Sequence, residues 1–261
     1  MGKGRSVWFA VIVASALMLI TVPEALAQQD DWKFGIGTGF FGLNVDGDVG
    51  FDTALGTIVL DAELDNSDVR DLTESAFGFG GFFAKNRWQI LYAVSHLTLE
   101  DSADGVTQGG ASASADVTFD ALFIEIAGVY GFARSERNAL GLLFGGRHVS
   151  HEYDLDVEVG ASSADRSLDE SWTDALVGLT HTFRFSPKLA WASRADAGFG
   201  GSEGTLSAQT GLNWQVAEIL MLSFYGKGTA HDFENGDPGD SDYYLYDATE
   251  FGVGVGFLFT F

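Results

Sequence analysis

The sequence predicts an all-β fold: a transmembrane, antiparallel, up-and-down β-barrel of ten strands, with eight and twelve strands as the alternatives. Ten segments alternate apolar residues with small or polar ones, which is the period of a strand whose two faces differ. The connections between these segments are alternately short and long, as in barrels that cross a membrane. After residue 27, no stretch approaches the roughly eighteen uninterrupted apolar residues of a membrane-spanning helix.

The N-terminal residues have the pattern of a secretory signal peptide. Lys3 and Arg5 precede an apolar run from Val7 to Val22, and the small-residue site Ala25-Leu26-Ala27 follows. We therefore expect residues 1–27 to be cleaved and residues 28–261 to form one barrel domain. The chain has no cysteine, which excludes disulfides, thiol catalysis and thiolate metal sites.

The two faces of each predicted strand differ in the size of their side chains. Glu250 and a row of glycines line one face of the last segment, and in the segment 122–132 the acid Glu125 is on the corresponding small-residue face. We expect this face to line the lumen and the apolar face to contact lipid. A soluble β-sandwich would favour Lys, Glu and Thr on its polar face. The opposite face of the last segment is apolar: Phe251, Val253, Val255, Phe257, Phe259 and Phe261.

The alternation also predicts where the strands lie. An even number of strands places both chain ends in the periplasm and directs the long acidic connections, near 46–73, 100–115, 158–170 and 232–248, outward. Residues 56–72 are open: we favour a loop or a small plug, while a further hairpin would raise the count to twelve, and Asn66-Ser67 could cap a short helical turn. The strands are expected near 32–43, 74–84, 86–99, 115–133, 138–157, 172–185, 188–201, 205–216, 219–231 and 249–261.

Charged residues on the predicted lumen face are nearly balanced in sign. Because an unpaired charge in a narrow lumen is costly, we expect them to pair across it as a charge network. A filled, braced interior is one interpretation, and a narrow pore that selects solutes is the other. The network comprises Lys33, Glu125, Arg147, Asp174, Arg184, Arg194, Asp196, Lys227 and Glu250.

The net charge of −23 excludes nucleic acid as a partner, because binding phosphates requires clustered Lys and Arg. Most acidic residues fall in the long connections and predict an anionic outer rim. Carboxylates are ligands for calcium, so divalent cations are candidate partners there. The segment 237–242 does not have EF-hand spacing, and whether any metal binds stays open.

Catalytic motifs are absent from the sequence. There is no G-x-S-x-G, no H-E-x-x-H and no phosphate-cradling loop. His96, His148 and His181 are predicted on the lipid face, and His151 and His231 near the rim. We therefore expect no enzyme activity, no catalytic residues and no cofactor.

The alternating strand that ends on Phe261 resembles the signal that directs barrels to the β-barrel assembly machinery of Gram-negative bacteria, with Phe251, Phe257, Phe259 and Phe261 as its apolar positions. Further motifs look familiar: Trp32, Asp46 to Gly50, Phe77 to Trp88, Gly145-Gly146-Arg147, Trp172-Thr173-Asp174 with Gly178, and Arg194 to Gly200. With these motifs the chain as a whole is similar to an uncharacterised family of Gram-negative outer-membrane β-barrel proteins. The resemblance implies the outer membrane as location, and it brings no substrate.

These observations predict a monomeric outer-membrane barrel that is structural, or that passively conducts small solutes, with an acidic extracellular rim. The alternatives are a lipid-modifying enzyme and a surface protein that binds a cation or another ligand. Outer-membrane lipid, lipopolysaccharide and the assembly machinery are the expected partners.

Overall fold

In the computed structural model, residues 31–53, 56–106, 112–159, 162–240 and 242–261 are described, and they form eleven strands and one helix. The expected signal peptide, residues 1–27, lies outside these residues. Within them no helix is long and apolar enough to cross a membrane. The elements are β1 (Lys33–Thr53), β2 (Gly56–Leu64), α1 (Asn66–Leu72), β3 (Thr73–Lys85), β4 (Trp88–Val106), β5 (Ser112–Arg134), β6 (Asn138–Val159), β7 (Ser162–Ser186), β8 (Leu189–Phe199), β9 (Gly204–Ala217), β10 (Leu220–Asn235) and β11 (Tyr244–Thr260).

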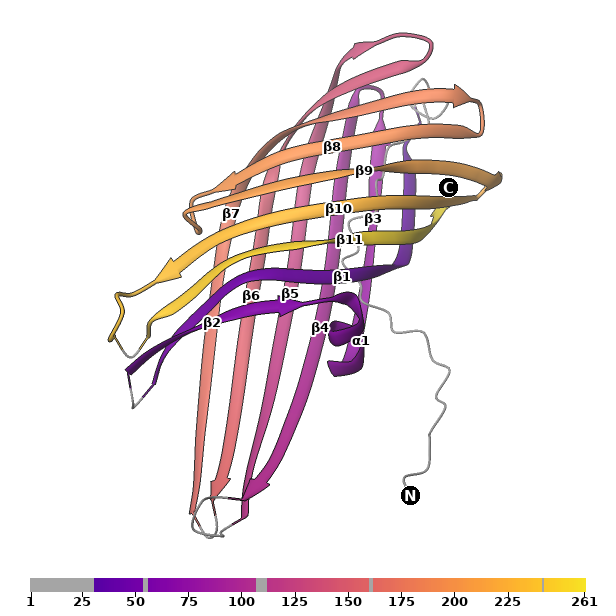
Figure 1. Cartoon of the computed structure of the whole chain (residues 1–261). Helices are drawn as coiled ribbons and strands as arrows, with labels where there is room; N and C mark the ends of the chain where they lie inside the picture. The colour runs from indigo at the N-terminus through magenta and orange to yellow at the C-terminus, as the bar shows by residue number, and fades with distance from the viewer. Residues whose placement is uncertain (1–30, 54–55, 107–111, 160–161, 241) are drawn as a thin grey trace, which may run out of the picture.

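Ten of the described strands close a barrel, which confirms the predicted fold class. Each strand from β3 to β10 pairs antiparallel with the next one in the sequence, and β1 completes the ring by pairing with both β11 and β3. Tight turns join strands at one end of the barrel, here called the short-turn end, where the last and first strands also meet. The opposite end carries the hairpins of β4 with β5 and β6 with β7, which extend well beyond the other strands (Figure 1). This is the long-hairpin end.

Residues 56–72 form neither the loop nor the lumen plug that we favoured. β2 pairs with β1 from Thr53↔Gly56 to Val45↔Leu64 as an extra strand outside the ten-strand count, and α1 follows it. The reason lies in β1, which pairs with β3 only from Lys33 to Gly37. From Gly37 toward the long-hairpin end, the edge of β1 that faces β3 is available to another strand. β2 pairs with the part of this edge farthest from Gly37.

The helix α1 lies where β1 and β3 diverge, and it packs against β1 and β4. Asp65 is its N-cap: its carboxylate accepts hydrogen bonds from the backbone N–H groups of Ser67 (2.7 Å) and Asp68 (3.1 Å), which satisfies donors at the helix start. The Ser67 hydroxyl also donates to it, and these hydrogen bonds lower the pKa of Asp65. Val69 is fully buried and packs with Phe41 and Leu43 of β1. The cap therefore starts the helix, and Val69 attaches it to the barrel wall.

Replacing Val69 by alanine is expected to lower the free energy of unfolding by about 2 kcal/mol, because two buried methyl groups are lost and a cavity remains. Urea unfolding in detergent micelles measures this loss, and limited proteolysis should show faster cleavage near α1. Asp71→Ala is the matched control, since this neighbouring side chain is 72% exposed. Equal unfolding curves for V69A and D71A would contradict the assigned packing.

Several strands are longer than expected from the sequence. The ladder between β4 and β5 continues to Val106↔Ser112, and that between β6 and β7 to Val159↔Ser162, through most of what we predicted as the loops 100–115 and 158–170. β1 likewise continues to Thr53 and β11 begins at Tyr244. Acidic residues of the predicted rim therefore lie largely on extended hairpins, which hold them at fixed register positions.

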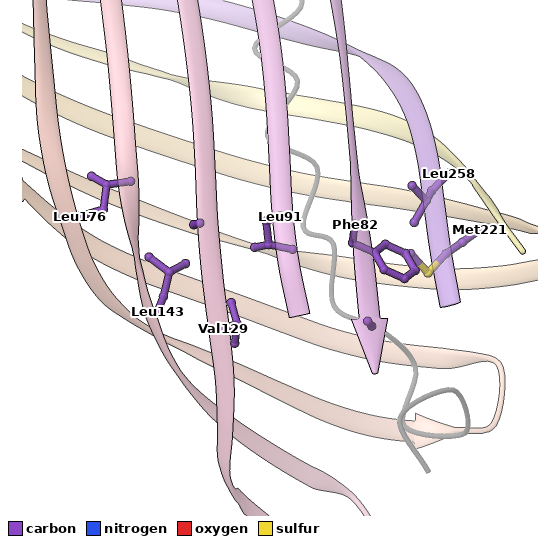
Figure 2. Packing of buried hydrophobic residues seen from close by; sticks show 9 residues of the cluster. Phe82, Leu91, Val129, Leu143, Leu176, Met221 and Leu258 are labelled. Atoms are coloured by element: carbon purple, nitrogen blue, oxygen red, sulfur yellow. The ribbon is translucent and has the colours of Figure 1, made fainter. Parts of the chain in front are cut away.

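An apolar layer fills the lumen near the short-turn end. Its side chains come from β3 to β7, β10 and β11 and form one buried cluster (Figure 2). Phe82, Leu143 and Leu258 have no exposed surface. Side chains thus occupy the lumen at this level. The apolar layer consists of Phe82, Ala84, Leu91, Ala127, Val129, Leu143, Leu176, Met221 and Leu258.

Candidate functional site in the barrel lumen

A ring of four charges lies in the lumen, on the long-hairpin side of the apolar layer. Glu125 of β5 accepts from Arg147 of β6 (Nη2 to Oε2, 2.9 Å) and from Arg194 of β8 (Nη1 to Oε1, 2.6 Å). Asp196 of β8 accepts from Arg147 at 2.9 Å and from Arg194 at 2.7 Å. Two cations and two anions are therefore closed into one salt-bridge ring that links strands lying apart in the barrel wall.

The salt-bridge ring is almost completely removed from solvent. The side chains of Glu125 and Arg147 are each 1% exposed, and that of Asp196 is 0% exposed. Breaking one partner of a buried ion pair leaves an uncompensated charge, whereas the intact, neutral ring satisfies both carboxylates. With this position and burial, the ring is placed to stabilise the barrel interior by linking its strands.

Asp174 was expected in the same charge network, but its partners are neutral. Its carboxylate accepts from the backbone N–H groups of Gly201 (3.0 Å) and Ser202 (2.9 Å), and from the hydroxyls of Ser202 (2.7 Å) and Thr205 (2.8 Å). Asp174 therefore fixes the connection between β8 and β9, which follows Phe199, against β7.

Lys227 and Glu250 lie higher in the lumen, close to two buried histidines. The Tyr246 hydroxyl donates to Glu250 at 3.0 Å, and His231 Nε2 lies 3.9 Å from the same oxygen. The Lys227 ammonium lies 5.0 Å from the centre of the Phe123 ring, a cation–π distance. A cavity of about 60 Å³ touches all of these except Tyr246.

The remaining space at this level is filled by an aromatic cluster. His151, 2% exposed, shares a hydrogen bond of 2.9 Å between Nδ1 and the Tyr244 hydroxyl. Trp172 stacks on Phe233 with ring centres 4.3 Å apart. Sequence reasoning placed His151 and His231 at the rim, yet both are buried inside. Their spacing could have shown it, because His151 is four residues from Arg147 and His231 four from Lys227, so each shares a strand face with a lumen residue.

Lys33 and Arg184 lie apart from the other charges, toward the short-turn end. Arg184 lines a cavity of about 20 Å³ together with Arg137 and Lys188. Lys33 is at the first position of β1 and pairs in register with Ala84. Of the nine predicted network residues, the structure thus joins four in the salt-bridge ring, places three elsewhere in the lumen and leaves Lys33 and Arg184 at the short-turn end.

The residues of the expected assembly signal lie along β11 and just after it. Val253 and Val255 share their strand face, and Phe251, Phe257 and Phe259 are exposed or half-buried there. Phe261 exchanges two backbone hydrogen bonds with Phe34, of 3.1 and 2.8 Å, and their rings stack with centres 5.0 Å apart. The last residue is therefore held against the first barrel strand.

Histidines on the outer face do not assemble a catalytic triad. His96 Nε2 lies 3.3 Å from Asp120, and the Thr98 hydroxyl donates to the same carboxylate at 2.6 Å. A nucleophile would have to give its proton to the imidazole, but this hydroxyl is directed to the acid. His148 and His181 contact Thr173 and Asn138, respectively.

The acidic hairpins do not present a preformed metal site in the described part of the chain. No group of three or more His, Asp or Glu side chains is arranged to hold an ion there. Cation binding at the rim therefore stays a prediction.

No protein-family model matches the chain, and no curated protein matches it. Among solved structures, it is similar to the outer membrane protease OmpT from Escherichia coli, with 11% identity, a TM-score of 0.49, and coverage of 89% of this chain and 97% of that one.

Two other solved structures are similar at a lower score. The translocator domain of the autotransporter NalP from Neisseria meningitidis has 13% identity, a TM-score of 0.43, and coverage of 90% of this chain and 91% of that one. Ail, the attachment invasion locus protein of Yersinia pestis, has 12% identity, a TM-score of 0.31, and coverage of 88% and 97%. The three names describe different activities, and these likenesses carry nothing about what this barrel does.

Proposed function

We propose that this protein is a closed, structural barrel of the outer membrane of a Gram-negative bacterium, which does not conduct solutes and which displays acidic hairpins outside the cell. The outer face supports the location. Large apolar side chains are exposed on it at strands around the wall, as a lipid-facing surface requires. In this orientation the short-turn end faces the periplasm and the long-hairpin end faces outward.

The observation that carries the proposal is the filling of the lumen in successive levels. On β6 the inward side chains Leu143, Arg147 and His151 belong in turn to the apolar layer, the salt-bridge ring and the aromatic cluster. Successive levels are about 13 Å apart along the strand. A solute would have to pass an apolar layer, a neutral ring of ion pairs and an aromatic cluster.

Planar-bilayer recording of the refolded protein tests the closed barrel. The wild type is expected to give no discrete conductance steps, at either polarity. Heat-dependent migration on gels identifies the fraction that has folded, so an absence of steps cannot be mistaken for an absence of barrel. Regular steps from folded wild-type protein would overturn the proposal in favour of the passive pore.

Variants that remove side chains from individual levels of the filled lumen provide a control within the same experiment. Phe82→Ala with Leu143→Ala weakens the apolar layer and should remain silent, because the salt-bridge ring still closes the lumen. Adding Arg147→Ala and Glu125→Ala, together with Trp172→Ala in the aromatic cluster, weakens all three levels and should produce steps. Steps from the first variant alone would show that the salt-bridge ring does not block ions.

A further inference from the structure

The outer face of the wall carries a groove that crosses five strands. Two adjoining cavities of about 680 and 740 Å³ share Gly42, Asn66, Thr210, Gly226 and Val253. Four of these residues lie on barrel strands and form one row of direct cross-strand neighbours: Gly42 opposite Val253, Val253 opposite Gly226, and Gly226 opposite Thr210, which in turn lies opposite Ser193. Because most residues in this row are small, the wall is hollowed along it.

A bulky row forms the wall of this groove. Two positions closer to the short-turn end on each strand, Phe40, Val255, Phe224, Leu212 and Trp191 are paired across the same five strands. Phe40, Phe224 and Trp191 are 38–48% exposed, so their rings stand out from the surface. The groove therefore has a continuous apolar side.

The polar atoms of its floor are engaged with one another. The Trp191 Nε1 donates to the Ser193 hydroxyl at 3.1 Å, the Ser193 and Thr210 hydroxyls are 2.7 Å apart, and the Thr210 hydroxyl donates to the Ala192 carbonyl at 3.2 Å. These groups already hydrogen-bond one another, so they offer few free hydrogen bonds to a polar ligand. A hydrocarbon chain needs no hydrogen bonds from them.

The groove slopes from one end of the barrel toward the other. Gly42 lies nine residues after the start of β1 at Lys33, Gly226 six after the start of β10 at Leu220, and Ser193 four after the start of β8 at Leu189. Four interstrand steps make it about 19 Å long, and one leaflet of hydrocarbon is about 15 Å deep. An acyl chain that descends from the outer leaflet fits this length and slope.

The upper end of the groove is polar and lies at α1. The Asn44 side chain accepts from the Asn66 backbone N–H at 2.9 Å, beside Gly42. Arg70, one turn further along α1, lines the groove, and its side chain is 54% exposed. Its Nε and Nη2 bond Asp71, and its other Nη takes no part in that pair.

One basic side chain, Arg70, is placed to receive an anionic group at this end. Of the twelve Lys and Arg residues in the described part of the chain, seven lie at the short-turn end and three in the lumen, which leaves Arg70 and Arg166 toward the long-hairpin end. The rest of that end is acidic and repels anions. Arg70 is thus the basic side chain that a headgroup phosphate would meet at the groove.

We propose that this groove binds one acyl chain of a phosphorylated glycolipid of the outer leaflet, the lipid A part of lipopolysaccharide, with a phosphate at Arg70. The proposal rests on the outward orientation of the long-hairpin end proposed above. The chain follows the small row beside the Phe40, Phe224 and Trp191 rings, and the guanidinium supplies a charge-assisted hydrogen bond.

Native mass spectrometry of purified, folded barrel with added hexa-acylated lipid A measures retention of one lipid. Gly226→Leu should abolish retention, since a side chain there enters the groove while its Cβ has ordinary room, 3.7 Å from the Gly252 carbonyl. Arg70→Ala should weaken binding about tenfold, the effect of losing a charged hydrogen bond, and dephosphorylated lipid A should bind R70A and wild type equally. Ala175→Leu, an outward position on β7 away from the groove, is the matched control.

Three outcomes would overturn the proposal. G226L could retain lipid A to the same extent as wild type, or A175L could lose as much retention as G226L. Wild type could also retain phosphatidylglycerol to the same extent as lipid A, which would mean annular lipid only. Each is read on protein that is folded on gels. Failure here with a silent bilayer recording would leave the closed barrel standing, whereas conductance would overturn that function independently of lipid binding.

Discussion

Replacing Arg147 by alanine is expected to lower the free energy of unfolding by about 3 to 5 kcal/mol, the cost of breaking a buried ion pair on one side. Arg147 bonds both Glu125 and Asp196, and its removal leaves two buried carboxylates with Arg194 as their remaining partner in the salt-bridge ring. Urea titration of the barrel in lipid vesicles, followed by tryptophan fluorescence, measures the change.

A charge-balanced variant distinguishes lost charge pairing from lost packing. Arg147→Met with Glu125→Gln keeps the volume and leaves Arg194 paired with Asp196, so most of the lost stability should return, because an apolar replacement of a buried pair is often neutral. If R147A unfolds within about 1 kcal/mol of wild type, or the double variant is no better than R147A, the salt-bridge ring does not brace the lumen.

The second large effect is expected in the apolar layer. Phe82→Ala should cost about 3 to 5 kcal/mol, because the ring is fully buried and its removal leaves a cavity beside Gly35, against which it packs. Phe82→Leu, which keeps most of the volume, should cost less than about 1.5 kcal/mol. The same urea titration compares them, and similar losses for both variants would place the ring outside the packed layer.

The positions of the strands within the membrane could be predicted from the sequence, because lipid on one side and a narrow lumen on the other impose a period of two. Phe251 and Glu250, adjacent in β11, have side chains on opposite faces for this reason. Beyond the membrane, both faces of a hairpin meet water and the alternation loses its meaning. Glu100 and Asp101 therefore looked like loop residues although they lie in β4 and are paired with β5.

The partners of the lumen residues could not be predicted in the same way. Alternation gives the face of a residue, while contacts across the lumen depend on how far each strand is shifted along its neighbours. Glu125 and Arg194 are 69 positions apart and on non-adjacent strands, yet their side chains meet at 2.6 Å. Asp174 shares their face and instead binds a turn. The short helical turn considered at Asn66-Ser67 is present as α1, with Asp65 as its cap, although seven residues are too few for a periodic signal.

The divergence of β1 from β3 has a consequence for how the chain folds. β1 forms seventeen register pairs with β11. It forms five with β3, the ring strand that follows it in the sequence. Until the last strand is in place, the first strand has little to hold it except β2. Pairing β1 with β11 closes a loop of more than 200 residues, and this closure has a correspondingly large entropy cost. The hairpins from β3 to β10 can form before it. The ring then closes in a late step, when β1 and β11 pair along their length.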